Sequence, residues 1–100
     1  MSYILQVHFP WPGPWGDEMT AAMEGLALSI AQEPGLIWKI WTGSEETQEA
    51  GGIYLFRDKL SAESYIKMHT QRLKAFGLTE MTHKIFSVNE ALSRLDNAPL

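Results

Sequence analysis

The sequence of 100 residues contains no cysteine. This absence excludes disulfides, thiolate nucleophiles, iron–sulfur clusters and cysteine-ligated zinc. No apolar run approaches the ~20 residues that a membrane-spanning helix needs. Residues 1–4 lack the basic region and the long apolar region of a signal peptide. We therefore expect a soluble, cytoplasmic protein without a metal.

Clustered positive charge is also missing. The net charge is -4 at pH 7, and the lysines and arginines are scattered along the chain. Counterion release from nucleic acid needs a clustered basic face, so we expect no nucleic-acid partner. There is no glycine-rich phosphate loop, no G-x-S-x-G and no histidine pair at metal spacing. Gly51-Gly52 is typical of a strand start or bulge, which argues against dinucleotide chemistry.

The segment from Glu33 to Phe56 is the centre of the predicted fold. A turn at Pro34-Gly35 precedes two short strands, 36–42 and 51–56, that are rich in β-branched and aromatic residues. In the first strand, simple alternation predicts two apolar faces, one with Leu36, Trp38 and Ile40, the other with Ile37 and Trp41. A strand that is apolar on both faces is covered on both. Helices of this chain can cover one face, and a partner subunit is expected on the other.

The remaining elements complete a β-α-β-β-α-β order. The expected elements are a strand over Tyr3–Phe9, a helix from an Asp17 N-cap to Gln32, a helix from Asp58 or Ser61 to Phe76 with Gly77 after it, a strand over Thr79–Val88, and a short helix Glu90–Leu95 capped by Asn89. With right-handed crossovers, this order gives a four-stranded antiparallel sheet with both long helices on one face. The prediction is a single α+β domain with the ferredoxin-like fold, spanning residues 1–100.

Three histidines are candidates for proton transfer. His69 lies on the apolar stripe of the second helix, where desolvation favours the neutral base form; the alternative is a core histidine bonded to a backbone carbonyl. His8 shares a strand face with Gln6, so it either lines a cavity or faces the interior of a dimer. His83 alternates with apolar residues and is expected to be structural. The three lack the local spacing of a metal site.

The four tryptophans suggest a second feature. Trp11 and Trp15 lie in a loop rich in proline and glycine, which is either a stiff connector or a lip over a cavity. The tryptophans either pack in the core and dimer interface or form a pocket for a flat, apolar ligand, with Tyr54 supplying a hydroxyl. Lys39 and Lys84 interrupt apolar strand faces, and each either pairs with a carboxylate across the interface or holds an anionic ligand group.

Several motifs together resemble the YdhR-type monooxygenase family. They are Glu33-Pro34-Gly35-x-x-Trp38-Lys39-x-Trp41-Thr42, Glu49-Ala50-Gly51-Gly52-Ile53-Tyr54-Leu55-Phe56, His69-Thr70-x-Arg72-Leu73-Lys74, Val88-Asn89-Glu90-x-Leu92 and the loop Gly13-Pro14-Trp15-Gly16-Asp17. That family belongs to the dimeric α/β-barrel superfamily, which includes antibiotic-biosynthesis monooxygenases and haem-degrading enzymes. The resemblance implies a homodimer of ferredoxin-like subunits with a cleft between sheet and helices, into which His69 would point.

The resemblance also bears on haem. Haem-degrading members of the superfamily use an asparagine on the first strand and a tryptophan on the third. The corresponding strands here offer Gln6 with His8, and Tyr54 with Phe56, which argues against haem cleavage.

Residues and resemblance together predict a monooxygenase that needs no cofactor and acts on a small aromatic, polycyclic phenolic compound. In this hypothesis His69 is the base and Tyr54 the hydrogen-bond donor to the developing oxyanion. The predicted walls are Trp38, Trp11 and Trp15, together with His8 or Phe9, depending on which face of the first strand meets the cleft. The alternatives are a non-enzymatic binder of a small hydrophobic molecule and, third, a haem-binding protein.

Overall fold

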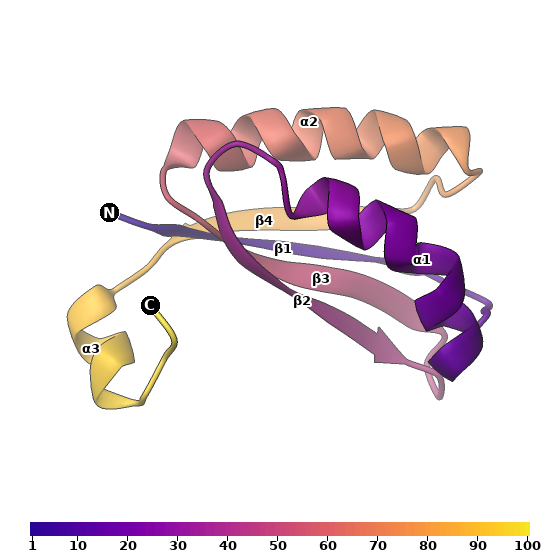
Figure 1. Ribbon diagram of the computed structural model, residues 1–100, viewed down its shortest axis with the longest axis horizontal. Coiled ribbons are helices and arrows are strands. Elements are labelled where there is room, and N and C mark those ends of the chain that lie inside the picture. Colours follow the sequence, from indigo (N-terminus) through magenta and orange to yellow (C-terminus); the bar gives the residue numbers. More distant parts are fainter.

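The computed structural model describes all 100 residues as a four-stranded sheet with two long helices on one face (Figure 1). In chain order the elements are β1 (Tyr3–Pro10), α1 (Gly16–Ile30), β2 (Leu36–Ser44), β3 (Glu49–Phe56), α2 (Lys59–Ala75), β4 (Thr82–Ser87) and α3 (Glu90–Leu95). The strand order is β2-β3-β1-β4, with every neighbouring pair antiparallel. The predicted ferredoxin-like fold is therefore confirmed. None of the helices is both long enough and apolar enough to cross a membrane.

The core lies between the sheet and the two long helices. Leu5 and Val7 of β1 are fully buried on this side, and Leu5 is paired with the equally buried Tyr54 of β3. They pack with Ile30 of α1 and Tyr65 of α2 in one cluster. Alternate residues of β1 therefore face the helices, as the sequence pattern predicts, and the odd-numbered residues are the inner ones.

A β-bulge changes the expected alternation of β2. The register of β2 against β3 is irregular between Leu36 and Trp38. Leu36 packs against the core, whereas Trp38 is opposite Leu55 on the other face of the sheet. We call this face, which α1 and α2 do not cover, the uncovered face. The prediction that Leu36 shares a face with Trp38 and Ile40 is wrong, because the extra residue in the bulge shifts every later side chain to the other face. The same shift turns Lys39 and Trp41 toward the helices.

Capping residues mark the start of α2, the start of α3 and the end of α2 where the sequence predicts them. The Asp58 carboxylate accepts a hydrogen bond of 2.8 Å from the backbone N–H of Ser61 at the start of α2. Asn89 does the same for Leu92 in α3, at 3.0 Å. Gly77 follows α2 with a φ of 85°, a left-handed conformation that suits glycine and closes the helix.

Both ends of α1 and the length of β4 differ from the prediction. Trp15, not Asp17, is the N-cap of α1, and its side chain makes no capping bond. Asp17 lies inside the first turn, where its charge interacts favourably with the helix dipole. The helix ends at Ile30 rather than Gln32. β4 is also shorter than expected, since only Thr82–Ser87 pair with β1.

Candidate active site

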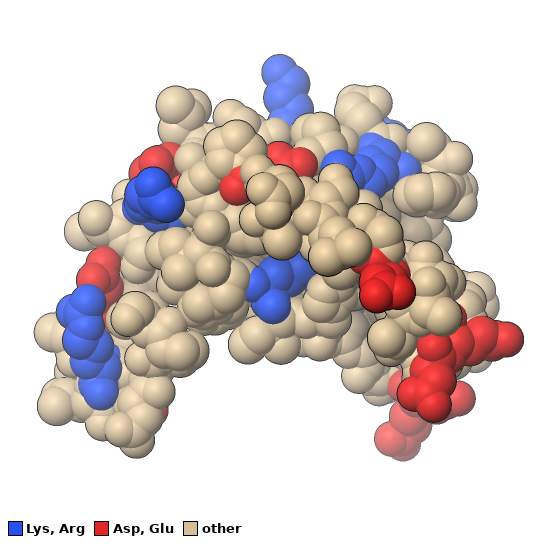
Figure 2. Space-filling view, viewed as in Figure 1, with Lys and Arg blue, Asp and Glu red and all other residues tan.

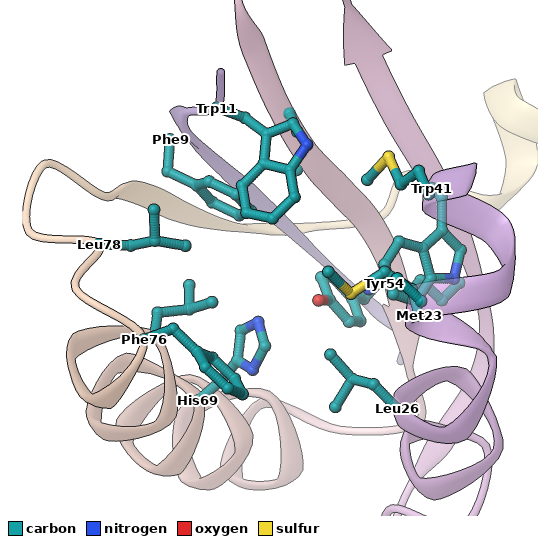
Figure 3. Close-up of a pocket in the computed structure, with 15 residues that line it drawn as sticks. Phe9, Trp11, Met23, Leu26, Trp41, Tyr54, His69, Phe76 and Leu78 are labelled. Carbon is teal, nitrogen blue, oxygen red and sulfur yellow. The ribbon is translucent and has the colours of Figure 1, made fainter. Parts of the chain in front are cut away.

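A cavity of about 350 Å³ lies between the sheet and the two long helices (Figure 3). This volume is within the ~300–1,000 Å³ that is usual for small-molecule sites. Of the 15 residues that line it, 12 are hydrophobic, so an apolar ligand body would be favoured. The residues labelled in the close-up are Phe9, Trp11, Met23, Leu26, Trp41, Tyr54, His69, Phe76 and Leu78.

His69 places a neutral imidazole at this cavity. The apolar stripe of α2 turns it toward the sheet, leaving it only 3% exposed. Its ring stacks on that of Tyr65 with centroids 5.1 Å apart. Burial, followed by the positive charges of Lys39 and Arg72, lowers the pKa of His69 to about 4. Its Nδ1 is fully buried without a hydrogen-bond partner, whereas Nε2 is not fully buried, so Nε2 is the nitrogen that a ligand can reach.

Tyr54 supplies the hydroxyl group of the cavity. It stands on the inner face of β3 and is 1% exposed. Its hydroxyl shares a hydrogen bond of 3.1 Å with that of Tyr65. Burial raises the pKa of Tyr54 well above its ordinary value, and burial also raises that of Tyr65 to about 12. Both phenols therefore stay protonated at neutral pH and can act as hydrogen-bond donors.

Lys39 is the charged residue of the cavity wall. Its Nζ lies 3.4 Å from the centroid of the Trp41 ring and 4.7 Å from that of Tyr54. Burial, followed by the charge of Arg72, lowers the pKa of Lys39 to about 7. The ion pairs of the chain are Glu33–Arg72 and Glu90–Arg94, so Lys39 has no carboxylate partner within it.

The loop after β1 forms another wall. The Phe9 and Trp11 rings meet edge to face at a centroid distance of 6.1 Å. The Nε1–H of Trp11 donates a hydrogen bond of 2.9 Å to the carbonyl of Pro14, which fixes the indole. In Figure 3 both rings border the open space above His69.

The structure thus brings together His69, Tyr54, Trp11 and Phe9, but not the other predicted site residues. Trp15 borders a separate shallow depression beside Pro14. Trp38 lies on the uncovered face, where its Nε1–H donates to the carbonyl of Pro99 at 2.8 Å. His8 also lies on that face, near Thr42. The β2 bulge explains Trp38, and the inner position of Phe9 excludes its neighbour His8 from the cavity.

Trp41 lines the cavity, although sequence reasoning named Trp38 rather than Trp41 as the β2 residue of the wall. After the bulge it alternates with Lys39, which is directly opposite Tyr54 in the register. The period-2 alternation of Lys39 and Trp41 is visible in the sequence, but which face they share depends on the bulge, which the sequence does not reveal. Phe76 and Leu78, at the end of α2, were also not expected in the lining.

The ionisable side chains form no metal centre, and those on one face of the molecule form no basic patch. No group of three or more histidine, aspartate or glutamate side chains is close enough to hold a metal ion. On the face shown in Figure 2, lysine and arginine side chains are spread apart rather than gathered in one patch.

Solved structures with the same fold include oxygenases. SnoaB, a cofactor-independent oxygenase from Streptomyces nogalater, superposes with a TM-score of 0.61 at 15% identity, over 88% of this chain and 93% of that one. The structural-genomics protein YJCS has a TM-score of 0.61 at 18% identity, over 88% of this chain and 98% of its own. A protein described as a putative antibiotic biosynthesis monooxygenase from Deinococcus radiodurans has a TM-score of 0.55 at 12% identity, over 89% and 93%. These likenesses define the class of fold.

The family follows from the sequence. The model described as "Putative mono-oxygenase ydhR" matches residues 4–99, so the chain belongs to that family. No curated protein sequence shows significant similarity to the chain.

Proposed function

We propose that this chain is a monooxygenase that needs no cofactor and oxidises a small aromatic, polycyclic phenolic compound with O₂. The observation that carries the proposal is the neutral, buried imidazole of His69, which lines a mostly hydrophobic cavity together with the protonated Tyr54. Membership of a family described as mono-oxygenases supports the class of reaction. SnoaB, with the same fold, is described as a cofactor-independent oxygenase.

The substrate itself supplies the electrons in this proposal. A base removes a proton from an activated CH₂ group, and the delocalised carbanion transfers one electron to O₂. The resulting radical and superoxide combine to form a carbon–oxygen bond, and protonation gives a hydroperoxide. Loss of water then converts CH–OOH to C=O. The balance is CH₂ + O₂ → C=O + H₂O, with one oxygen atom in the product and the other in water.

Each group of the cavity has one role in this sequence. His69 accepts the proton at Nε2, the nitrogen that is not fully buried, because its low pKa keeps the imidazole neutral. When Tyr65 donates to Tyr54, as the pair is arranged here, the Tyr54 hydroxyl can donate to the developing oxyanion. Trp11 and Trp41 hold the flat ring system and exclude water from the anion.

Dithranol, 1,8-dihydroxy-9-anthrone, is a suitable test substrate, because oxygen oxidises its CH₂ group to a ketone. We expect the wild-type protein to form 1,8-dihydroxyanthraquinone faster than the protein-free solution does, as measured by mass spectrometry. A chelator should leave the rate unchanged, and removal of O₂ should abolish it. Anaerobic turnover would contradict the proposal. Binding detected by tryptophan fluorescence without any product would favour the non-enzymatic ligand-binding protein.

His69→Ala should lower the rate above background by ~10²–10⁴-fold, the usual contribution of a positioned base. His83→Ala is the matched control, since His83 is exposed on β4 and lies outside the cavity lining.

We also propose that the working unit is a homodimer, joined through the uncovered face of the sheet. Ile40 and Phe86 on this face are 52% and 47% exposed, respectively. Figure 2 shows the molecule hollowed beneath the sheet, between α3 and the end where β2 meets β3. A second copy can fill such a hollow by two-fold pairing, the commonest symmetry of soluble oligomers.

A further inference from the structure

The polar lining of the cavity is basic or neutral throughout. Its ionisable members are Lys39, His69 and Tyr54, and no aspartate or glutamate lines it. Arg72 adds a positive charge nearby; Glu33 pairs with it at 3.9 Å, but its Nη1 is buried without a hydrogen-bond partner. Lys39 has no such carboxylate partner, and a cation in a poorly solvated site without a counterion is costly. A ligand with a negative charge would remove that cost.

The fold makes specific room for the Lys39 side chain. A Cβ at Gly52 would lie 2.7 Å from Cε of Lys39, so the absence of a side chain there lets the lysine stem cross β3. The ammonium of this half-buried side chain then lies against the Trp41 and Tyr54 rings. The missing Cβ leaves room for the amine at the cavity wall, and the two rings contact it there.

We propose that Lys39 binds the ionised oxygen of a planar aromatic ligand, so that the cavity selects acidic phenols and enols. This inference rests on the proposed function and names the substrate class of the same site. It also gives Lys39 the part of a specificity-determining residue that touches the substrate, distinct from His69 and Tyr54.

Proton balance favours a phenol or an enol over a permanently charged anion. With a pKa of about 7, Lys39 is partly a neutral amine in the empty cavity at neutral pH. When a phenol enters, its O–H bond breaks and an N–H bond forms on Nζ, so the pair becomes ammonium and phenolate without net proton uptake. The opposite charge stabilises both ions in the cavity. The negative oxygen also makes the ring system more electron-rich, which favours the later electron transfer from the carbanion to O₂.

The experiment uses alizarin, 1,2-dihydroxyanthraquinone, whose phenolate absorbs at longer wavelength than its neutral form. Anthraquinone, which has no hydroxyl, is the matched neutral probe. We expect alizarin bound to the wild-type protein to ionise at a pH ~1–3 below that of free alizarin, the usual effect of an adjacent positive charge. Anthraquinone affinity should not change with pH across the same range.

Three variants assign the effect. Lys39→Met should return the ionisation of bound alizarin to that of the free dye. It should also weaken alizarin binding by ~10–1,000-fold, the factor that corresponds to this change in pKa, with anthraquinone affinity retained. Lys39→Arg keeps a positive charge and should still ionise the bound dye at low pH. Lys67→Met is the control on the exposed side of α2 and should behave as wild type.

Several outcomes would overturn the inference. One is bound alizarin that stays neutral in the wild-type protein, or that ionises equally in Lys39→Met; another is a wild-type protein that binds neither probe. If Lys39→Met fails to fold, the wild-type comparison of alizarin with anthraquinone decides alone. Because these are equilibrium measurements, they can be separated from the oxygenase assay. If bound alizarin ionises at a lower pH than free alizarin but the protein consumes no O₂, the inference about Lys39 holds and the proposed oxygenase function fails. If the protein oxidises dithranol but does not lower the pH at which alizarin ionises, the function holds and the inference fails.

Discussion

His69 joins the chemistry of the cavity to the stability of the fold. Its imidazole is 3% exposed and has a pKa of about 4, against an ordinary value of 6.5. The unfolded chain therefore binds more protons than the folded protein between these two values. Stability contributed by the neutral ring is complete above pH 6.5 and is lost as the pH falls toward 4.

The first prediction is an acid sensitivity that belongs to this residue. The melting temperature of the wild-type protein should fall between pH 7 and pH ~4.5, and that of His69→Phe should fall less, because phenylalanine cannot take up a proton. Differential scanning calorimetry over this range measures both. His83→Phe, at an exposed position, should keep the wild-type profile. Equal acid sensitivity in His69→Phe would show that another group is responsible.

The second residue-scale prediction concerns the two tyrosine hydroxyls. Tyr65→Phe removes the hydrogen-bond partner of Tyr54 inside the core. The free energy of unfolding should drop by about 1–3 kcal/mol, the cost of leaving a buried hydroxyl unpaired. Urea denaturation measures this difference. Tyr3→Phe is the control, because no hydrogen bond of the Tyr3 hydroxyl is seen, and it should change stability by less than ~0.5 kcal/mol.

At the scale of the elements, the sequence predicts which helices and strands exist better than it predicts their phase. The stripe of α2 and the caps at Asp58 and Asn89 follow from local spacing, and the structure has them. The β2 bulge depends on pairing with β3, which no local pattern reveals, so Trp38 and Trp41 exchange faces relative to the expectation. His69 lies in the cavity as predicted because local spacing sets the stripe of α2. The cavity wall contains Trp41 instead of Trp38 because the bulge changes the phase of β2.

The close pairing of β1 with β3 gives the third prediction. A Cβ at Gly51 would overlap the backbone carbonyl of Val7, and backbone in the middle of a sheet cannot retreat. Gly51→Ala should therefore cost more than ~3 kcal/mol or prevent folding. Gly25→Ala is the matched control, since nothing lies within 4 Å of a Cβ there and the residue is inside α1. It should stabilise the fold by ~0.5–1 kcal/mol. Unchanged stability in Gly51→Ala would contradict the β1–β3 register.

At the scale of the whole molecule, one face of the sheet lacks the helix layer that the other face has. α3 and the C-terminal segment lie on this side but reach only one end of it (Figure 1). The contact from Trp38 to Pro99 ties that segment to β2. The exposed Ile40 and Phe86 remain beside it, which is why a second copy of the chain is the proposed cover.

The fourth prediction follows from the proposed packing of a second copy against the uncovered face. In the proposed dimer this face becomes part of the core, so the melting temperature should rise with protein concentration, and sedimentation at micromolar concentration should give twice the chain mass. Ile40→Asp should abolish assembly, since it would bury an unpaired charge. Leu28→Asp on the solvent side of α1, where Leu28 is 66% exposed, should leave assembly unchanged. A monomer whose melting temperature does not depend on concentration would contradict the proposed assembly.

The fate of the oxygen atoms tests the proposed reaction most directly. Dithranol is incubated with the wild-type protein under ¹⁸O₂ in ordinary water, and the ketone is analysed by mass spectrometry before it exchanges with solvent. Direct reaction of the bound anion with O₂ predicts one ¹⁸O atom in the new carbonyl and one in water. It also predicts that His69→Ala lowers the rate of labelled product formation above that of the protein-free solution by ~10²–10⁴-fold. Product that carries oxygen from water, or wild-type protein that adds nothing to the uncatalysed rate, would contradict the proposal.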